Sequence, residues 1–409
     1  MTTPIKDKRI ILGVTGSIAC YKAADLASKL AQAGANVDVI LTQAALQFIT
    51  PLTFKSVTGA GAYVEADLWG SEGHVLHISL GHSADLVVIA PASANTIAKL
   101  AHGIADNLLT VTALAARCPL LIAPAMDGGM YTHPATQANL EILRGRGAVI
   151  AGPAQGHLAS GLLGIGRMLE PSELLGHIRL ALAQDGPLKG RKVIVTAGGT
   201  HEPIDPVREI TNRSSGKQGF AIAQAALDLG AQVTLIAAPA ELGTPVGARR
   251  QDVRTAQEML DAVLEAVPGS DALIMAAAVA DFRPVDPKEH KIKKTGGIPQ
   301  IVLENTPDIL REVASYRVNS GFPRLVAGFA AESRDLLENA GTKLRDKKLD
   351  LIAANDISAG DAGFAVDTNQ VTLLHADGSM ETLPLMSKEQ VAEAILAKIV
   401  GKLGVRGVG

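Results

Sequence analysis

The sequence predicts an α/β fold built from two doubly wound domains, each with a mainly parallel sheet. Short, continuous apolar runs, typical of strands buried on both faces, alternate with stretches of helical spacing. An apolar strand followed by a glycine-containing loop opens both halves, as "RIILGVTGS" near the start and "RKVIVTAGGT" in the middle. Between them, residues 184–190 are polar and contain Gly and Pro, as a linker would.

In the first half, the expected strand at residues 9–14 is followed by a helical pattern that stops at Gly34. Four more buried strands are expected in "NVDVILT", "DLVVIAPAS", "PLLIAPAM" and "AVIAGP". Parallel sheets bind ligands at the carboxyl ends of their strands. The loops "TGSIA", "PASANT" and "PAMDGGMY" each follow a strand, so we expect them to gather at one edge of the sheet.

The second half continues with strands of the same buried type in "QVTLIAAP", "ALIMAAAVA", "RLVAGFAAE" and "DLIAAND". Near the end, "AVDTNQVTLLHADGSMETLPL" alternates apolar and polar residues and contains Asp377-Gly378, a strong hairpin signal. The second domain is therefore expected to carry an antiparallel edge on its parallel sheet.

Composition excludes several classes of protein. A net charge of -3 and 3% aromatic residues argue against a nucleic-acid partner. No uncharged apolar run is long enough to span a membrane, and the first residues lack the features of a signal peptide. Cys20 and Cys118 lie in apolar segments, so we expect buried thiols in a reducing cytoplasm rather than a redox pair.

The stretch "GVTGSIA", Gly13 to Ala19, combines a strand end, a glycine turn and a helix start. Backbone N–H groups at a helix N-terminus bind phosphate, and Thr15 and Ser17 add hydroxyl groups. A simple tight turn is the alternative, because neither G-x-G-x-x-G nor a P-loop is present. A second polar cluster, Ser93, Asn95 and Thr96, follows another strand and favours a phosphorylated ligand.

The third loop, "AMDGGMY", raises a question of its own, because apolar methionine is unusual on an exposed loop unless it covers something. His77 and His82 precede a buried strand, where a lone histidine is more often structural than catalytic. The spacing of His and Cys residues offers no metal site of those ligands.

Two segments of the second half carry the most polar chemistry. The loop "GGTHEPIDPVREITNRSSGKQGF" runs into a helix that is expected to start near Ser215-Gly216. Its candidate anion-binding residues are Arg208, Asn212, Ser214, Ser215 and Lys217. The small-residue strand of "AAAVADFRPVDPKEHKIKK" would let a ligand approach the backbone, and Asp281 could hold Mg²⁺.

Five lysines could neutralise phosphate groups near these segments. Lys291 and its neighbours Lys293 and Lys294 follow Asp281, and a solvated basic face is an equal alternative for the last two. Lys343 and Lys347 are spaced i, i+4, which places them on one face of one helix.

With these motifs in order, the chain resembles the bifunctional phosphopantothenoylcysteine decarboxylase/phosphopantothenate–cysteine ligases of coenzyme A synthesis. The resemblance covers about residues 8 to 400. In the second half it rests on "DPVREITNRSSGKQGFAIA", "AAAVADFRP", "KIKK", "NTPDIL", "GFAAES" and "KLDLIAAND". In the first half it rests on "GVTGSIA", "HISL", "ADLVVIAPASANT" and the P-x-M-x-x-x-M loop.

The resemblance implies a flavoprotein-like decarboxylase domain at residues 1–183, a linker at 184–190 and a Rossmann-like ligase domain at 191–409. The ligase would use CTP, with Mg²⁺ or Mn²⁺, to make an acyl-cytidylate of 4′-phosphopantothenate, which the amine of cysteine attacks. FMN would then serve the oxidative decarboxylation and the reduction that give 4′-phosphopantetheine. The family also implies a homo-oligomer, in which dimeric ligase domains and trimeric flavin domains would give a dodecamer.

The resemblance assigns roles residue by residue. His77, Ser160, Asn212 and Arg208 match catalytic positions, and Met126, Asp127 and Met130 match the substrate loop. The expected FMN-binding residues are Gly13, Thr15, Gly16, Ser17, Ser93, Asn95 and Thr96. The expected nucleotide-binding residues are Ala276, Ala277, Asp281, Lys291, Pro307, Asp308, Ile309, Leu310, Phe329, Lys343 and Lys347, with Asp281 also the metal ligand.

Two positions depart from the family pattern. Asp127 stands where the family has an Asn that binds the substrate carboxylate, and Ser160 stands where it has a Cys thought to donate a proton. Two carboxylates in a desolvated cleft repel each other, and a hydroxyl is a far weaker acid than a thiol. The first domain is therefore either a working variant or a scaffold for oligomerisation; a redox sensor or electron carrier would leave the ligase motifs unexplained.

Overall fold

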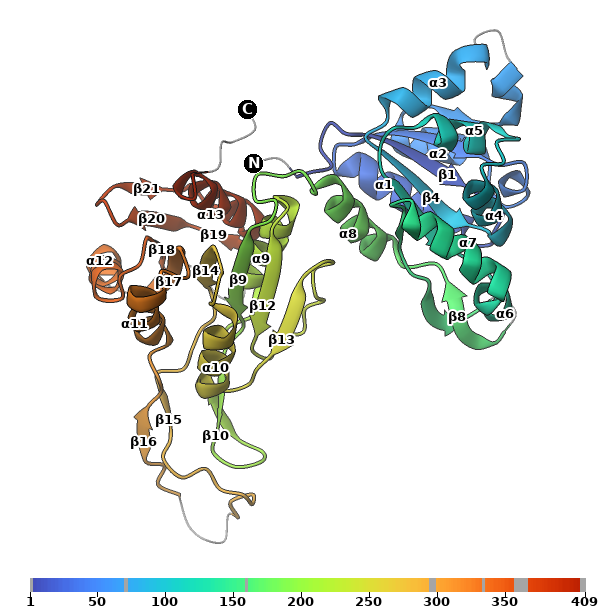
Figure 1. Cartoon of the computed structure of the whole chain (residues 1–409). Helices are drawn as coiled ribbons and strands as arrows, with labels where there is room; N and C mark the ends of the chain where they lie inside the picture. The colour runs from blue at the N-terminus through green and yellow to red at the C-terminus, as the bar shows by residue number, and fades with distance from the viewer. Residues whose placement is uncertain are drawn as a thin grey trace. The chain divides into compact units, whose positions relative to one another are not determined.

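The computed structural model describes residues 3–69, 73–158, 161–293, 299–332, 335–356 and 367–404. The chain divides into two compact units, Thr2–Gln184 and Asp185–Gly409. Each unit is built around one large sheet with helices packed on it (Figure 1).

The first unit contains a six-stranded, all-parallel sheet in the order β3-β2-β1-β4-β5-β6. Its strands are β1 (Arg9–Val14), β2 (Asn36–Leu41), β3 (Ala62–Tyr63), β4 (Leu86–Ala92), β5 (Leu120–Pro124) and β6 (Val149–Ile150). Its helices are α1 (Cys20–Gln32), α2 (Pro51–Thr58), α3 (Gly73–Ser83), α4 (Ala94–His102), α5 (Leu108–Ala115), α6 (Gly128–Thr132), α7 (Pro134–Gly145) and α8 (Pro171–Leu182), with short 3₁₀ turns at Ala45–Gln47 and Glu65–Trp69. A separate antiparallel hairpin joins β7 (Ala154–His157) to β8 (Leu163–Arg167).

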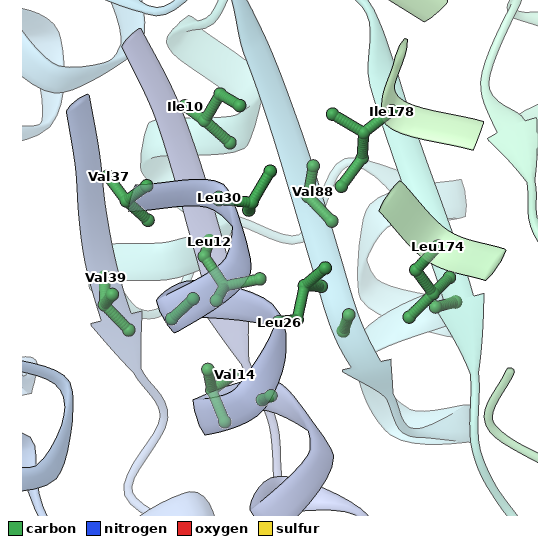
Figure 2. Close-up of a cluster of buried hydrophobic side chains, with 14 of the residues drawn as sticks. Ile10, Leu12, Val14, Leu26, Leu30, Val37, Val39, Val88, Leu174 and Ile178 are labelled. Atoms are coloured by element: carbon green, nitrogen blue, oxygen red, sulfur yellow. The ribbon is translucent and has the colours of Figure 1, made fainter. Parts of the chain in front are cut away.

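Hydrophobic cores lie on both faces of this sheet, which is why its strands are mainly apolar. On one face, Leu12 and Val88 of the sheet pack with Leu26 of α1 and Ile178 of α8 (Figure 2). On the other face, Ile11 belongs to a cluster that draws on α4, α5 and α7. Neighbouring residues of one strand thus point into different cores, as alternation along a strand requires.

The second unit contains an eight-stranded sheet in the order β13-β12-β9-β14-β17-β18-β20-β21. Its strands are β9 (Lys192–Ala197), β12 (Gln232–Ala237), β13 (Arg249–Asp252), β14 (Ala272–Met275), β17 (Leu325–Glu332), β18 (Leu351–Asp356), β20 (Val371–His375) and β21 (Met380–Thr382). Its helices are α9 (Lys217–Asp228), α10 (Ala256–Ala266), α11 (Ile309–Ser320), α12 (Leu336–Asp346) and α13 (Lys388–Lys402). Short antiparallel pairs join β10 (His201–Pro203) to β11 (Glu209–Thr211), β15 (Phe282–Pro284) to β16 (Leu303–Asn305), and β19 (Thr368–Asn369) to β22 (Met386–Ser387).

The predicted fold class is confirmed in both units. The antiparallel edge is also present, because β20 pairs with β18 and β21, and Gly378 in the predicted turn has a φ of +85°. Within the polar loop that follows β9, the structure adds the hairpin β10–β11. Strand β13, "RRQD", carries no apolar run, so hydrophobic patterning missed it.

Cys20 is buried as expected, and burial raises the pKa of its thiol, whereas Cys118 is only partly buried. Among the described residues, none of the helices combines the length and apolar character that crossing a membrane requires.

Candidate functional site

At the carboxyl edge of the first sheet, the loop after β1 is bonded to the end of β4. The buried hydroxyl of Thr15 donates to the carbonyl of Pro91 at 2.8 Å and accepts from the N–H of Ser93 at 2.9 Å. Thr15 therefore supports the loop from within. A Cβ on Gly16 would lie 2.6 Å from the Cβ of Ala44, so only glycine allows this close approach.

The first turn of α1 follows this loop. The N–H of Ala19 donates to the hydroxyl of Ser17 at 3.2 Å, and the N–H groups of Cys20 and Lys22 donate to the carbonyls of Ser17 and Ala19. The N-cap of α1 is Ala19, and no described side chain caps the helix. The second predicted cluster is partly internal, because Ser93 caps α4 by accepting from the N–H of Thr96, which is buried. Asn95 is exposed. The partly exposed hydroxyl of Ser17 and the exposed amide of Asn95 are polar groups that suit a phosphate such as that of a flavin nucleotide.

The methionine loop lies against the β7–β8 hairpin. The N–H of Met126 donates to the carbonyl of Gly166 at 3.0 Å, and Met126 packs against the core, so this methionine covers the sheet. Met130 is 51% exposed. Asp127 is the N-cap of α6: its exposed carboxylate accepts from the N–H of Gly129 at 2.9 Å. Ser160, the other departure from the family pattern, lies outside the described residues.

His77 lies in the middle of α3 and is half-buried. In the part of the chain that the structure describes, its Nδ1 is buried and has no hydrogen-bond partner. A buried ring nitrogen without a partner costs free energy unless something outside the described residues satisfies it. His82, on the same helix, is exposed.

In the second unit, two buried threonines after and within β9 hold the small-residue segment. Thr196 accepts from the N–H of Ala277 at 3.1 Å, and Thr200 accepts from the N–H of Ala280 at 2.9 Å. The backbone of Gly199 also bridges to Ala278. The segment that follows β14 is therefore pinned to the loop that follows β9.

Asn212 joins the same segment from the end of β11. Its Nδ2 donates to the carbonyls of Ala278 at 3.2 Å and Val279 at 3.1 Å. A Cβ on Gly199 would lie 2.9 Å from the carbonyl oxygen of Asn212, so the two loops are in close contact. Both amide donors of Asn212 are thus used to hold the loop, which leaves its Oδ1 as the group that can accept from a ligand.

Arg208 is held by a buried acid that sequence reasoning did not single out. Asp205 accepts from the guanidinium of Arg208 at 2.9 Å and from the N–H of Ile292 at 3.1 Å. Burial alone would raise the pKa of Asp205, but these groups and the N–H of Val207 keep it below its ordinary value. One carboxylate thereby brings Arg208 next to the segment that carries Lys291.

Some of the predicted nucleotide residues contact one another or their neighbours after β14 and along β17. The N–H of Thr306 donates to the carbonyl of Asp281 at 3.0 Å, which places the next residue, Pro307, close to Asp281. Lys343 donates to the carbonyl of Phe329 at 2.8 Å. Lys347 pairs with Asp308, the N-cap of α11, and burial lowers the pKa of this lysine.

The remaining basic candidates are less constrained. Lys291 and Lys293 are exposed, and Lys294 lies outside the described residues. Across the described ranges, no three His, Cys, Asp or Glu side chains are grouped so that they could hold a metal ion by themselves. Asp281 is exposed and could contribute a single carboxylate.

Sequence reasoning missed the residues that hold the site together: Thr196, Thr200, Asp205 and, in the first unit, Lys22. Each carries out its role through contacts with distant residues. The only local signal is the D-x-x-R spacing of Asp205 and Arg208, which is common at turns.

Fold and site together define a two-domain α/β protein with a polar, loop-built site at the carboxyl edge of each sheet. The family model described as "Flavoprotein" matches residues 1–182, and the model described as "DNA/pantothenate metabolism flavoprotein C-terminal domain" matches residues 188–403. The coenzyme A biosynthesis bifunctional protein CoaBC of Bacillus subtilis (strain 168) is 44% identical over 97% of both chains. That of Mycobacterium tuberculosis (strain ATCC 25618 / H37Rv) is 45% identical over 96% of both.

Among solved structures, the C-terminal domain of a CoaBC protein is 39% identical and covers 54% of this chain and 99% of its own, with a TM-score of 0.46. The chain belongs to the family of coenzyme A biosynthesis bifunctional proteins, as the motifs predicted. It is an enzyme that combines phosphopantothenoylcysteine decarboxylase and phosphopantothenate–cysteine ligase activities, and its first domain is a flavoprotein domain.

Proposed function

We propose that residues 191–409 join cysteine to 4′-phosphopantothenate with CTP, and that residues 1–183 then decarboxylate the product with bound FMN. Residues 184–190 serve as the linker. The observation that carries the ligase assignment is the way one polar loop is held against two other segments. Asn212 donates to the carbonyls of Ala278 and Val279, and Asp205 joins Arg208 to Ile292.

In the ligase step, the carboxylate of 4′-phosphopantothenate attacks the α-phosphate of CTP and pyrophosphate leaves. Lys291, Lys343 and Lys347 neutralise the phosphates, and Phe329 lines the nucleotide site with Ala276, Ala277 and Pro307–Leu310. Asp281 would supply one carboxylate to Mg²⁺ or Mn²⁺, which would neutralise part of the phosphate charge. The amine of cysteine then attacks the acyl carbon, and CMP leaves.

In the acyl-cytidylate, Arg208 contacts the phosphate and Asn212 accepts from the intermediate through Oδ1. Both roles agree with the contacts described above. Asp205 orients Arg208, which stays about half exposed, and the carbonyl of Val279 orients Asn212. Ser214, Ser215 and Lys217 at the start of α9 provide further polar groups for an anion.

In the decarboxylase domain, Ser17 before α1 and Asn95 in the first turn of α4 would hold the phosphate of FMN. The flavin supplies reversible two-electron chemistry on the cysteinyl group of the substrate. His77 exchanges a proton with the substrate. Met126, Asp127 and Met130 form the loop that contacts the substrate, and Ser160 stands at the position of the family's proton donor.

Asp127→Asn should preserve decarboxylation or raise kcat/KM, by at most about fivefold. Asn accepts the N–H of Gly129 as Asp does, so the cap of α6 remains, while repulsion of the substrate carboxylate is removed. An exposed charge contact is worth at most about 1 kcal/mol, which sets the upper limit. CO₂ release at low and high salt measures the effect, with Asp127→Ala as the variant that loses the cap. A tenfold loss in Asp127→Asn would show that this chain needs the carboxylate.

A fragment of residues 185–409 should fold and release pyrophosphate from CTP when given 4′-phosphopantothenate and Mg²⁺. Leu188 must be kept, because it is fully buried and its N–H donates to Leu229 at 2.7 Å. Pyrophosphate release by the fragment and by the full chain is compared directly. A well-folded fragment that is inert with all substrates would contradict the domain assignment.

We propose a cytoplasmic homo-oligomer in which the ligase domains form dimers. If the flavin domains also form trimers, the two kinds of contact together give a dodecamer. The arm formed by β15 and β16 supports the ligase dimer. Phe282, Val285 and Val302 on it are more than half exposed, which is unusual for large apolar side chains grouped on one hairpin.

The alternative keeps the ligase and makes the first domain an oligomerisation scaffold, because Asp127 and Ser160 depart from the family pattern. Bifunctional relatives that match nearly the whole chain do not favour it. A coupled assay with 4′-phosphopantothenate, cysteine, CTP and Mg²⁺ separates the two when pyrophosphate and CO₂ are measured independently. Both products are expected, and chelation of Mg²⁺ should stop pyrophosphate release. Pyrophosphate without CO₂, and no change in the flavin spectrum with authentic substrate, would favour the scaffold.

A further inference from the structure

Lys22, in the first turn of α1, is buried although lysine is seldom found inside proteins. Its ammonium group donates to the carbonyl of Met168 at 2.9 Å and to the carboxylate of Glu170 at 2.8 Å. Met168 and Glu170 come directly after β8, the second strand of the β7–β8 hairpin. The side chain of Lys22 therefore connects α1 to the base of the β7–β8 hairpin. Helix α1 follows the loop of residues 15–19, called the phosphate loop below because the phosphate of FMN is proposed to bind there.

The partner groups form a small network at the surface. Glu170 also accepts from the guanidinium of Arg167 at 2.6 Å and is about half exposed. The hydrogen bond from Lys22 holds the pKa of Glu170 below its ordinary value. Met168 itself is buried in the core, which fixes the position of the backbone directly after β8.

The backbone of β8 is in close contact with the methionine loop, residues 126–130. A Cβ on Gly166 would lie 2.1 Å from the carbonyl oxygen of Met126, and one on Gly128 would lie 2.9 Å from the carbonyl oxygen of Ile165. The N–H of Met126 also donates to Gly166. Because backbone meets backbone, a shift of β8 has to displace the loop that carries Asp127.

We propose that Lys22 is a positioning residue for the decarboxylation, which holds β8 and the loop of residues 126–130 in register with the phosphate loop. This inference rests on the proposed function of the first domain. The ammonium group acts through Met168 and Glu170 and not on the reacting atoms. Misplacement of reacting groups by about 1 Å can lower a rate about 100-fold, so a positioning contact of this kind has a measurable effect.

The test uses the full-length protein with its flavin bound. Lys22→Met keeps the apolar stem and removes the donors, and Glu170→Gln keeps an acceptor but removes its charge at a half-exposed site. Lys29→Met is the matched control, because Lys29 lies on the same helix in an exposed pair with Asp25. Four quantities are measured: kcat and KM for CO₂ release, bound flavin, pyrophosphate release, and the rate of trypsin cleavage after Arg167.

Lys22→Met should lower kcat roughly 10- to 100-fold and speed cleavage after Arg167, while bound flavin and pyrophosphate release stay unchanged. Glu170→Gln should shift both quantities in the same direction by less, and Lys29→Met should match wild type. Faster cleavage with unchanged kcat would overturn the proposal and leave Lys22 a structural role only. Loss of flavin in both variants would also overturn it, since Lys22 would then act on cofactor binding or folding.

A failure of the proposed function has a different signature. Wild-type protein would then release no CO₂, whereas the cleavage assay would still report whether Lys22 holds β8. Equal cleavage rates in wild type, Lys22→Met and Glu170→Gln would refute the positioning role independently of any activity.

Discussion

Replacement of His77 by asparagine should lower the rate of decarboxylation at least 100-fold while the protein keeps its flavin and its ligase activity. Positioned proton transfer contributes about 10²- to 10⁴-fold to enzymatic rates, and asparagine cannot titrate near neutral pH. His77 lies on α3, away from the phosphate loop in sequence, and its Nδ1 is buried without a described partner. CO₂ release, flavin absorbance and pyrophosphate release measured on one preparation check the result.

His82→Asn is the matched control for this prediction, because His82 is exposed on the same helix and should tolerate the change. A His77→Asn protein that decarboxylates within twofold of wild type would exclude His77 from proton transfer. A protein that loses its flavin would instead assign the histidine to cofactor binding.

Asn212→Asp should lower the yield of the cysteine amide about tenfold or more, with a smaller effect on the first pyrophosphate burst. The two N–H groups that bond Ala278 and Val279 are replaced by carboxylate oxygens, which those carbonyls repel. Because these hydrogen bonds are exposed to solvent, their loss costs about 0.5–1.5 kcal/mol, and the added charge also repels the phosphate of the acyl-cytidylate. We therefore expect the intermediate to leak or accumulate.

A quenched-flow experiment separates pyrophosphate release from cysteine-dependent CMP release. Asn212→Ala, which loses the two donors without adding a charge, shows how much of the loss comes from the missing hydrogen bonds. Unchanged steady-state amide formation by Asn212→Asp would remove Asn212 from the mechanism.

Much of the fold follows from local patterning. β1, β4 and β9 each contain a continuous buried run because both of their faces are covered, and such mainly apolar runs can be recognised in the sequence. The hairpin β20–β21 was predictable because Asp-Gly accommodates the left-handed conformation that its turn requires. β13 was not, since a polar edge strand is held by backbone pairing with β12, which leaves no mark on side-chain pattern.

The candidate site divides in a similar way. Asn212 and Arg208 could be selected from the sequence, because a run of hydrogen-bonding side chains on one loop is chemically distinctive. The residue that holds Arg208 in place could not be selected in this way. Asp205 is a common turn residue in sequence, yet in the structure it joins Arg208 to Ile292, which is 84 positions away from Arg208.

Periodicity and short motifs are properties of neighbouring residues, so they were enough to predict the two parallel-sheet domains, the family and the chemical types at each loop. The role of each side chain depends instead on the folded arrangement. Thr15 proved to be an internal support, Asp127 a helix cap and Lys22 a contact to the hairpin base, since each role depends on a hydrogen bond or ion pair with a specific partner. For Thr15 and Lys22 that partner lies far along the chain, where the folded backbone, and no local rule, sets the distance.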